Sequence, residues 1–314
     1  MSTLSIPRLR KAVFFVIAVG AFTIVGCGAG KGKPEIVWGE RGVLDGEFIK
    51  PRASAIDAYG RLYIVDYSAR IQVYDTNGKY LGPTWTTPDW SGGRPSGLSI
   101  DREGNLLVSD SHYSCIRIYD RQGKELRVLG GQTGSKPGQF GYISDVVQDS
   151  DGHYYVSEFG PLTQRITKLD PDGTYLTSWG APGTENGQFA QIRGLELGPD
   201  GLIYAADSCN HRIQVFTRDG KFVRTWGQPG TEPGSLRYPY DVTISPKPPH
   251  HVYVIEKGNN RVQKFTRDGE PLGIWGGPGR EPGKLYAPWA IVVDPRGRVH
   301  VIDSGNNRVQ RFRF

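Results

Sequence analysis

The chain has 314 residues, of which 38 are basic and 32 acidic, and 37% are hydrophobic. Three of the basic residues lie within the first 26, so the remaining 288 residues carry a net charge of only +3. So small a charge is no argument for nucleic-acid binding, and the sequence has no basic block with interleaved aromatic residues. We therefore predict no nucleic-acid partner.

The N-terminal segment carries a predicted export signal. A basic start precedes an apolar run from Ala12 to Ile24, and Val25-Gly26-Cys27 follows. Such a run is typical of a secretory signal, and its roughly 15 uncharged residues fall short of the ~20 that a spanning helix needs. The segment ending at Cys27 resembles the bacterial lipobox. This resemblance implies a signal peptide over 1–26, lipidation at Cys27, a short tether over 27–34 and a place in the cell envelope, on the periplasmic or extracytoplasmic membrane face. A plain secretory signal and an uncleaved anchor remain alternatives.

The rest of the chain repeats six times, at intervals of 44 to 49 residues. An acidic residue closes the second apolar run of each repeat, namely Asp66, Asp110, Glu158, Asp207, Glu256 and Asp303. A second series, usually followed by Gly, consists of Trp38, Trp85, Leu129, Trp179, Trp226 and Trp275. A period in this range, built of short strands, is typical of propeller blades.

Each repeat is predicted to hold four strands. The fourth repeat shows them best, as short runs at 194–197, 202–206, 212–216 and 221–227. Asp-Gly turns between alternating runs are typical of hairpins, and four antiparallel strands per repeat make a propeller blade. We therefore predict an all-β, six-bladed β-propeller over residues 35–314. The Asp-rich turns, such as 149–152, are too short for an EF-hand calcium loop, so we interpret them as strand connections.

The two ends of the propeller complete each other in this prediction. The chain stops at a third strand, Arg308 to Phe314, and Glu35 to Gly39 is an isolated fourth strand. Placing 35–39 on the outside of the last blade removes an exposed sheet edge. Cys115 and Cys209 belong to non-adjacent blades, farther apart than the ~7 Å that a disulfide allows between Cα atoms. We therefore expect two free, buried thiols.

Three segments carry a family resemblance: Asp207–Phe216, Glu256–Gln263 and Asp303–Gln310 are similar to NHL repeats. The resemblance covers residues 35–314 and implies a six-bladed propeller. NHL members include peptide-amidating lyases, sensor domains of bacterial kinases and the RNA- or protein-binding domains of tripartite-motif proteins, so the function stays open. Two departures are Cys115, where the repeat expects Arg, and a longer loop at 159–164.

Charge pairs and tryptophans that recur in most blades are predicted to be structural. The acid of each second strand is expected to pair with a following Arg by bidentate hydrogen bonds. The pairs are Asp66 with Arg70, Glu158 with Arg165, Asp207 with Arg212, Glu256 with Arg261, and Asp303 with Arg308. The outer Trp series is expected to fill space between blades.

Residues that vary at repeating positions are better candidates for function. The residue before each innermost strand is expected at one mouth of the central channel, and the residue after it just inside. From these positions we predict a ligand site formed by Arg52, Ser96, Ser144, Asp145, Arg193, Tyr240, Asp241 and Trp289. Polar groups among aromatic side chains on a concave surface suit ligand binding; the alternative is a solvated rim. We further expect Asp145 and Asp241 to hold the two arginines when no ligand is bound.

The mouth positions contain no histidine. The resemblance to amidating lyases implies Pro-His-Gly at these positions, with histidines that hold zinc. We therefore predict no zinc lyase, no bound metal and no cofactor. There is also no serine triad at a nucleophile elbow. The favoured function is binding of an unknown protein or small acidic ligand, with the membrane reached through the lipid anchor. A lactonase-like, metal-assisted enzyme remains the alternative.

Overall fold

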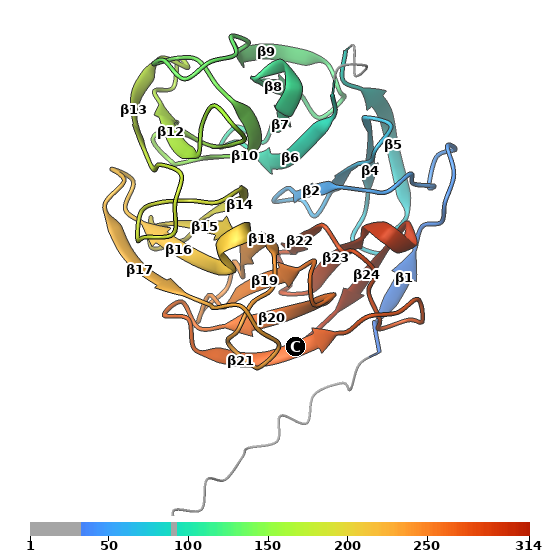
Figure 1. Ribbon diagram of the computed structural model, residues 1–314. Helices are drawn as coiled ribbons and strands as arrows, with labels where there is room; N and C mark the ends of the chain where they lie inside the picture. The colour runs from blue at the N-terminus through green and yellow to red at the C-terminus, as the bar shows by residue number, and fades with distance from the viewer. Residues whose placement is uncertain (1–32, 89–92) are drawn as a thin grey trace, which may run out of the picture.

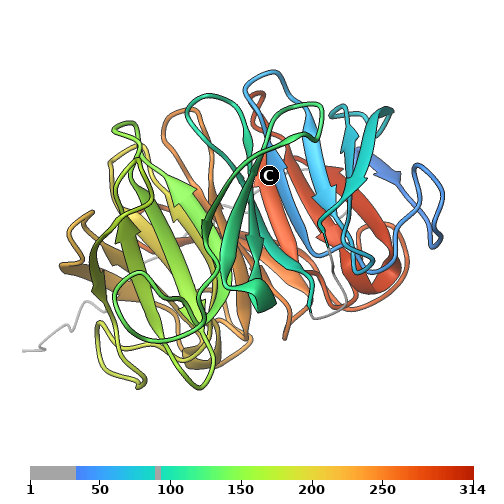
Figure 2. The same cartoon turned by 90° about the horizontal axis from the view of Figure 1, so that it is seen from above.

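The computed structural model describes residues 33–88 and 93–314. The predicted signal peptide, the lipidation site at Cys27 and most of the tether lie outside the described residues. Within them, 24 strands form six four-stranded antiparallel sheets around a central channel (Figure 1), and Figure 2 shows these sheets standing side by side in the ring. The predicted all-β, six-bladed propeller is confirmed. No helix in this part of the chain is long and apolar enough to cross a membrane.

Each blade runs from an innermost strand at the channel to an outermost strand at the rim. The first three blades consist of β2 (Ala53–Ile56), β3 (Leu62–Val65), β4 (Arg70–Tyr74) and β5 (Tyr80–Thr86); β6 (Pro95–Ile100), β7 (Leu106–Asp110), β8 (Cys115–Tyr119) and β9 (Glu125–Gly130); and β10 (Tyr142–Gln148), β11 (Tyr154–Phe159), β12 (Arg165–Leu169) and β13 (Tyr175–Trp179).

Blades 4 to 6 consist of β14 (Ile192–Leu197), β15 (Ile203–Asp207), β16 (Arg212–Phe216) and β17 (Phe222–Trp226); β18 (Pro239–Ile244), β19 (Val252–Glu256), β20 (Arg261–Phe265) and β21 (Pro271–Gly276); and β22 (Ala290–Val293), β23 (Val299–Asp303), β24 (Arg308–Phe312) and β1 (Ile36–Trp38). We call the face at which the innermost strands begin the mouth face, and the opposite face, with its tight Asp-Gly turns, the underside.

The N-terminal strand completes the last blade. The sheet order is β1-β24-β23-β22, with Ile36 opposite Arg311 and Trp38 opposite Val309 (Figure 1). This confirms that the ends of the described chain close the ring in one sheet. Because β24 runs from the mouth face to the underside and β1 is antiparallel to it, the chain enters the propeller from the underside.

The recurring Trp residues pack against glycines of the next blade. A Cβ added to Gly78 would lie 2.4 Å from Cγ of Trp38, and one added to Gly220 would lie 2.6 Å from Cδ2 of Trp179. Both glycines have φ near +80°, which an L side chain rarely adopts. The indole ring therefore takes the space of a missing side chain, as predicted for a residue that fills the gap between blades.

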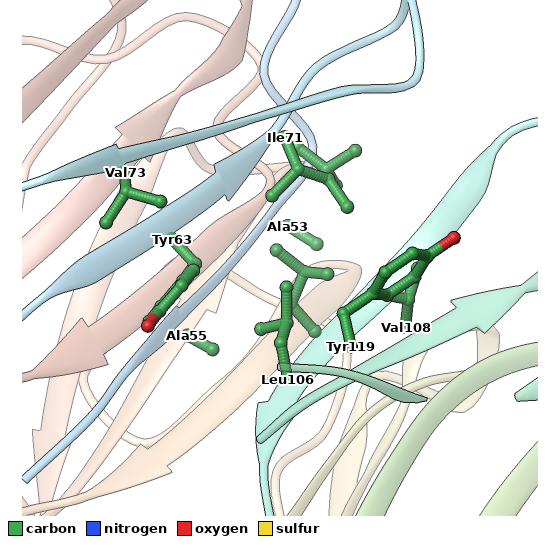
Figure 3. Close-up of a cluster of buried hydrophobic side chains, with 10 residues drawn as sticks. Ala53, Ala55, Tyr63, Ile71, Val73, Leu106, Val108 and Tyr119 are labelled. Carbon is green, nitrogen blue, oxygen red and sulfur yellow. The ribbon is translucent and has the colours of Figure 1, made fainter. Parts of the chain in front are cut away.

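Buried apolar side chains also fill the wedge between neighbouring blades. Between blades 1 and 2, Tyr63 and Val65 of β3 belong to one buried cluster with Leu106 and Val108 of β7, and all four are at most 1% exposed. Figure 3 shows Tyr63, Leu106 and Val108 of this cluster. Because every wedge is filled in this way, the inner strands form a rigid frame around the channel.

The recurring acid of the second strand is the centre of a buried network. In blade 4, the Asp207 carboxylate accepts hydrogen bonds from Nε of Arg212 (2.8 Å), Nδ2 of Asn210 (2.9 Å) and the amide of Ala190 (2.8 Å). The same Arg212 also donates from Nη2 to the carbonyl oxygen of Gln188, at 2.9 Å. The structural role is confirmed, but the expected bidentate geometry is wrong here, because the guanidinium divides its donors between carboxylate and backbone.

Four other blades contain the predicted pair, at N–O distances of 2.5 to 2.9 Å: Asp66 with Arg70, Glu158 with Arg165, Glu256 with Arg261, and Asp303 with Arg308. Blade 2 replaces the expected Arg by Cys115. There Arg117, two residues further along the strand, bonds Asp110 at 2.7 Å and restores the ion pair.

Cys115 and Cys209 are both free, as predicted, but only Cys115 is buried. Burial raises the pKa of the Cys115 thiol to about 11. Cys209 lies exposed in the short 3-10 turn Ser208–Asn210 on the mouth face, so its predicted burial is wrong.

Candidate ligand site at the channel mouth

The central channel forms a cavity of about 330 Å³ lined by the innermost strands. Seven of the eight predicted site residues line it: Arg52, Ser96, Asp145, Arg193, Tyr240, Asp241 and Trp289. The eighth, Ser144, is only 1% exposed and bonds through Oγ to Oγ of Ser157, at 2.7 Å. Its assignment to the ligand site is therefore corrected.

A local irregularity of the innermost strands explains why neighbouring positions face differently. The pairing register shifts between Pro95 and Gly97 in β6, and between Ile143 and Asp145 in β10. Such a bulge inserts one unpaired residue and redirects its side chain. Ser96 is the inserted residue of β6, and its Oγ donates to the carbonyl oxygen of Ile143 at 2.8 Å, so this hydroxyl joins blade 2 to blade 3.

Arg52 and Arg193 extend into the mouth from blades 1 and 4, which lie opposite each other. The pKa of Arg52 is lowered, first by burial and then by the positive charge of Arg193. The Nε–H groups of both arginines are buried and have no hydrogen-bond partner among the described residues. Because a buried, unpaired N–H is costly, both arginines carry an unsatisfied donor beside the cavity that they line.

Aromatic rings hold the cations of the mouth. The Arg52 guanidinium lies 4.9 Å from the centre of the Trp289 ring, and that of Arg193 lies 4.4 Å from the Phe159 ring. Nζ of Lys257 lies 4.4 Å from the rings of both Tyr240 and Trp289, and donates to the Tyr240 hydroxyl at 3.1 Å. Cation–π contacts orient a cation but supply no counter-charge, so the rings give these side chains no anionic partner.

Lys257 and Phe159 are functional candidates that the sequence analysis missed. Both occupy the position after the acid that ends a second strand. Across the six blades this position holds Tyr67, Ser111, Phe159, Ser208, Lys257 and Ser304. Ser is the regular residue, so the departures in blades 1, 3 and 5 are the signal that identifies this outer ring of the mouth.

Asp145 and Asp241 do not hold the arginines, so that expectation is wrong. The two oxygens of Asp145 accept from the amides of Val146 and Leu195, both at 2.9 Å. Asp241 has the same geometry between blades 5 and 6, where its Oδ2 accepts a hydrogen bond from the amide of Ile291 at 3.0 Å. Each aspartate therefore joins its own blade to the next one through backbone hydrogen bonds.

Glu196 performs the same task between blades 4 and 5, because its Oε1 accepts from the amide of Ile244 at 3.0 Å. Burial raises the pKa of Glu196 to about 8 and that of Asp241 to about 7. The pKa of Asp145 is also raised, by burial first and by the charge of Asp241 second. Within the described residues, these channel carboxylates form no ion pair with the cations of the mouth.

One group of possible metal ligands lies elsewhere. In the described part of the chain, Asp149, Asp151 and His153 form the one cluster of His, Cys, Asp and Glu donors within 4.8 Å of one another. A cation already lies at this underside turn, because Nη1 of Arg218 lies 3.2 Å from a carboxylate oxygen of Asp149 and 2.9 Å from one of Asp151. A guanidinium thus occupies the place of a cation, in agreement with the interpretation of this turn as a strand connection.

The family model for the NHL repeat matches residues 189–216 and 285–312. This chain contains NHL repeats within a six-bladed β-propeller. Two curated relatives extend the match. Peptidylglycine alpha-amidating monooxygenase of Rattus norvegicus is 38% identical over 132 residues, which are 39% of this chain. NHL repeat-containing protein 3 of Mus musculus is 26% identical over 180 residues, which are 52% of this chain and 51% of that protein. The match spans only about an eighth of the monooxygenase, 13% of its length.

Solved propellers of low sequence identity share the fold of this NHL-repeat chain. Virginiamycin B lyase from Staphylococcus aureus superposes with a TM-score of 0.59 at 13% identity, over 84% of this chain and 94% of that one. A gluconolactonase from Xanthomonas campestris gives a TM-score of 0.61 at 14% identity, over 84% of this chain and 87% of that one. At this identity the likeness concerns the fold alone.

Proposed function

We propose that this NHL-repeat propeller is an envelope lipoprotein that binds an acidic ligand at the channel mouth. The observation that carries the proposal is the pair of opposed guanidiniums of Arg52 and Arg193, each with a buried Nε–H that lacks a partner among the described residues. Lys257 adds a third cation to the same mouth. Arginine suits the bidentate recognition of a carboxylate or phosphate.

The shape and the walls of the site narrow the ligand class. The cavity of about 330 Å³ lies at the lower end of the range for small-molecule pockets, roughly 300–1,000 Å³. Tyr240 and Trp289 meet edge to face, with ring centres 5.2 Å apart, and offer one aromatic wall beside the cations. Aromatic walls suit flat or ring-shaped groups. A small acid, a peptide carboxyl terminus or an anionic saccharide fits this combination.

The binding proposal is tested by the double substitution Arg52→Ala with Arg193→Ala. Each lost hydrogen bond to a charged group contributes roughly 1.5–3 kcal/mol, so affinity should fall well over tenfold. Calorimetry with a panel of dicarboxylates, uronic acids and a short peptide with a free carboxylate would identify a ligand and measure the loss. The matched control is Arg218→Ala with Arg267→Ala on the underside, which should leave affinity unchanged. Equal affinities for both double variants would place the site elsewhere.

The lipoprotein part of the proposal rests on the sequence around Cys27. The variant Cys27→Ala should lose incorporation of labelled fatty acid in bacterial cells and should leave the membrane fraction. If the variant incorporates as much label as the parent, this part of the proposal is wrong, whereas the binding site at the mouth is unaffected.

A metal-assisted lyase or lactonase at the same mouth is the second candidate function. It is favoured by the carboxylates of Asp145, Asp241 and Glu196, which border the cavity and offer oxygen ligands for a hard cation. Against it, each of them already accepts backbone amides of the neighbouring blade. Elemental analysis of the dialysed protein separates the candidates, since stoichiometric metal that Asp145→Asn with Asp241→Asn removes would favour the enzyme.

A further inference from the structure

The point where the chain enters the propeller fixes which face is near the N-terminus. Glu35 comes directly before β1 and pairs with Arg311 at 3.0 Å and Arg313 at 2.8 Å, at the underside end of β24. The described chain therefore begins at the underside of blade 6, on the face opposite the mouth.

The connection from Cys27 to this point is short. The eight residues from Gly28 to Glu35 span at most about 26–29 Å at ~3.3–3.6 Å per residue. The innermost strands of four to seven residues give the propeller a height of similar size, at ~3.3 Å per residue. To turn the mouth to a membrane, such a tether would have to run back along the height of the propeller, whereas the underside lies at its point of entry.

Charge is unevenly distributed over the underside. The turns of blades 6, 1 and 2, at 57–61, 75–79, 101–105, 120–124 and 294–298, hold seven basic and six acidic residues. The turns of blades 3 to 5, at 149–153, 170–174, 198–202, 217–221, 245–251 and 266–270, hold four basic and eight acidic residues. The half that contains the chain entry is thus weakly positive, and the opposite half is distinctly negative.

The positive half also presents an exposed aromatic residue between cations. Tyr59 is 74% exposed, and the guanidiniums of Arg61 and Arg121 lie 5.5 Å and 4.8 Å from its ring centre. Tyrosine beside basic residues suits the headgroup region of a bilayer, where one end of the ring is apolar and the other polar.

We propose that the underside of blades 6, 1 and 2 rests on anionic lipid headgroups, so that the channel mouth points away from the membrane. This orientation rests on the lipidation of Cys27 in the proposed function. The tether supplies the proximity, and the charge difference between the two halves of the underside tilts the entry side towards the lipid. The mouth is then open to soluble ligands of the surrounding compartment.

Energy transfer from single dyes to headgroup-labelled lipid tests the orientation on lipidated protein in vesicles of phosphatidylethanolamine and phosphatidylglycerol. The exposed Cys209 provides a native label on the mouth face, while the buried Cys115 stays unlabelled. In a Cys209→Ser background, Gln122→Cys labels the positive half of the underside and Ser150→Cys the negative half. Transfer should be several-fold stronger from Gln122→Cys than from Cys209, with Ser150→Cys between them.

Two controls separate the tether from the charges. On vesicles without phosphatidylglycerol, or with Arg121→Gln and Lys124→Gln, the two underside labels should give equal transfer while Cys209 stays lowest. Transfer from Cys209 that equals or exceeds that of the underside labels would overturn the orientation. Equal underside labels on anionic vesicles would overturn the headgroup contact. Parent protein that carries no lipid and does not bind vesicles would refute anchoring and orientation together, whereas ligand binding by the soluble propeller is measured independently.

Discussion

The substitution Trp38→Ala tests whether the N-terminal strand holds the ring closed. Trp38 is the last residue of β1 in blade 6 and packs against blade 1. Its ring centre lies 4.5 Å from that of Tyr74 and 5.8 Å from that of Phe48. Its indole also covers Gly78, where no side chain exists to replace it. Removing the ring therefore opens a cavity between blades 6 and 1 that the frame cannot fill.

The size of the effect follows from this packing. A fully buried Trp or Phe loses about 3–5 kcal/mol on truncation to Ala, and Trp38 is only half-buried, so about 2–4 kcal/mol is expected. Its Nε1–H has no partner among the described residues, so no hydrogen bond is lost in addition. Since about 1 kcal/mol shifts the melting temperature of a domain of this class by roughly 2–4 °C, the midpoint should fall by at least about 4 °C.

Differential scanning calorimetry of the propeller without its signal segment measures this shift. Val37→Ala is the matched control, because Val37 lies in the same strand but is 36% exposed at the rim. It should change the midpoint by less than half as much. If the two variants melt together, or if Trp38→Ala melts like the parent, β1 does not stabilise the closure and the reasoning fails.

Two further substitutions probe the buried carboxylates. Asp207→Ala should lower the free energy of unfolding in urea by about 3–5 kcal/mol, because it leaves the guanidinium of Arg212 buried without its anion. The control Asp219→Ala, at a side chain that is 82% exposed, should change this free energy by under about 0.5 kcal/mol. Glu196→Gln should flatten the pH dependence of stability: its folded pKa of about 8 lies above its unfolded value, so the native state holds an extra proton and the parent loses stability as pH rises from about 5 to about 8. A parent whose melting temperature rises over that interval, with the Gln variant unchanged from it, would contradict this sign.

The fold was predictable because the same local interactions recur in most blades. The acid, the following Arg and the outer Trp mark the second, third and fourth strands at nearly constant spacing. The length of the repeat therefore predicted a four-stranded blade, and the number of repeats predicted a ring of six blades. The isolated strand at 35–39 then had one complementary edge, at Arg308–Phe312, and the pairing of β1 with β24 confirms it.

The mouth was predictable only in part, because a residue's level along the channel does not fix the direction of its side chain. Ser144 bonds Ser157 of its own blade, although the repeat aligns it with Ser96 and Arg193, which line the cavity. The carboxylate partners also escaped prediction. The amides of Leu195 and Ile291 belong to other blades, about 50 residues away in sequence, and periodicity gives no information on such contacts.

The channel contains buried cations and buried carboxylates, and the structure stabilises the two kinds of charge in different ways. At the mouth, aromatic rings support Arg52 and Lys257 and leave their charge uncompensated. Deeper in the channel, backbone amides satisfy Asp241 and Glu196, and burial raises their pKa values into the neutral range, so part of their negative charge is removed by protonation. An ion pair between the two groups would have cancelled both fields. Because the carboxylates accept hydrogen bonds from neighbouring blades instead, they help to hold the ring together, and the mouth keeps the positive field on which the proposed binding of an acidic ligand depends.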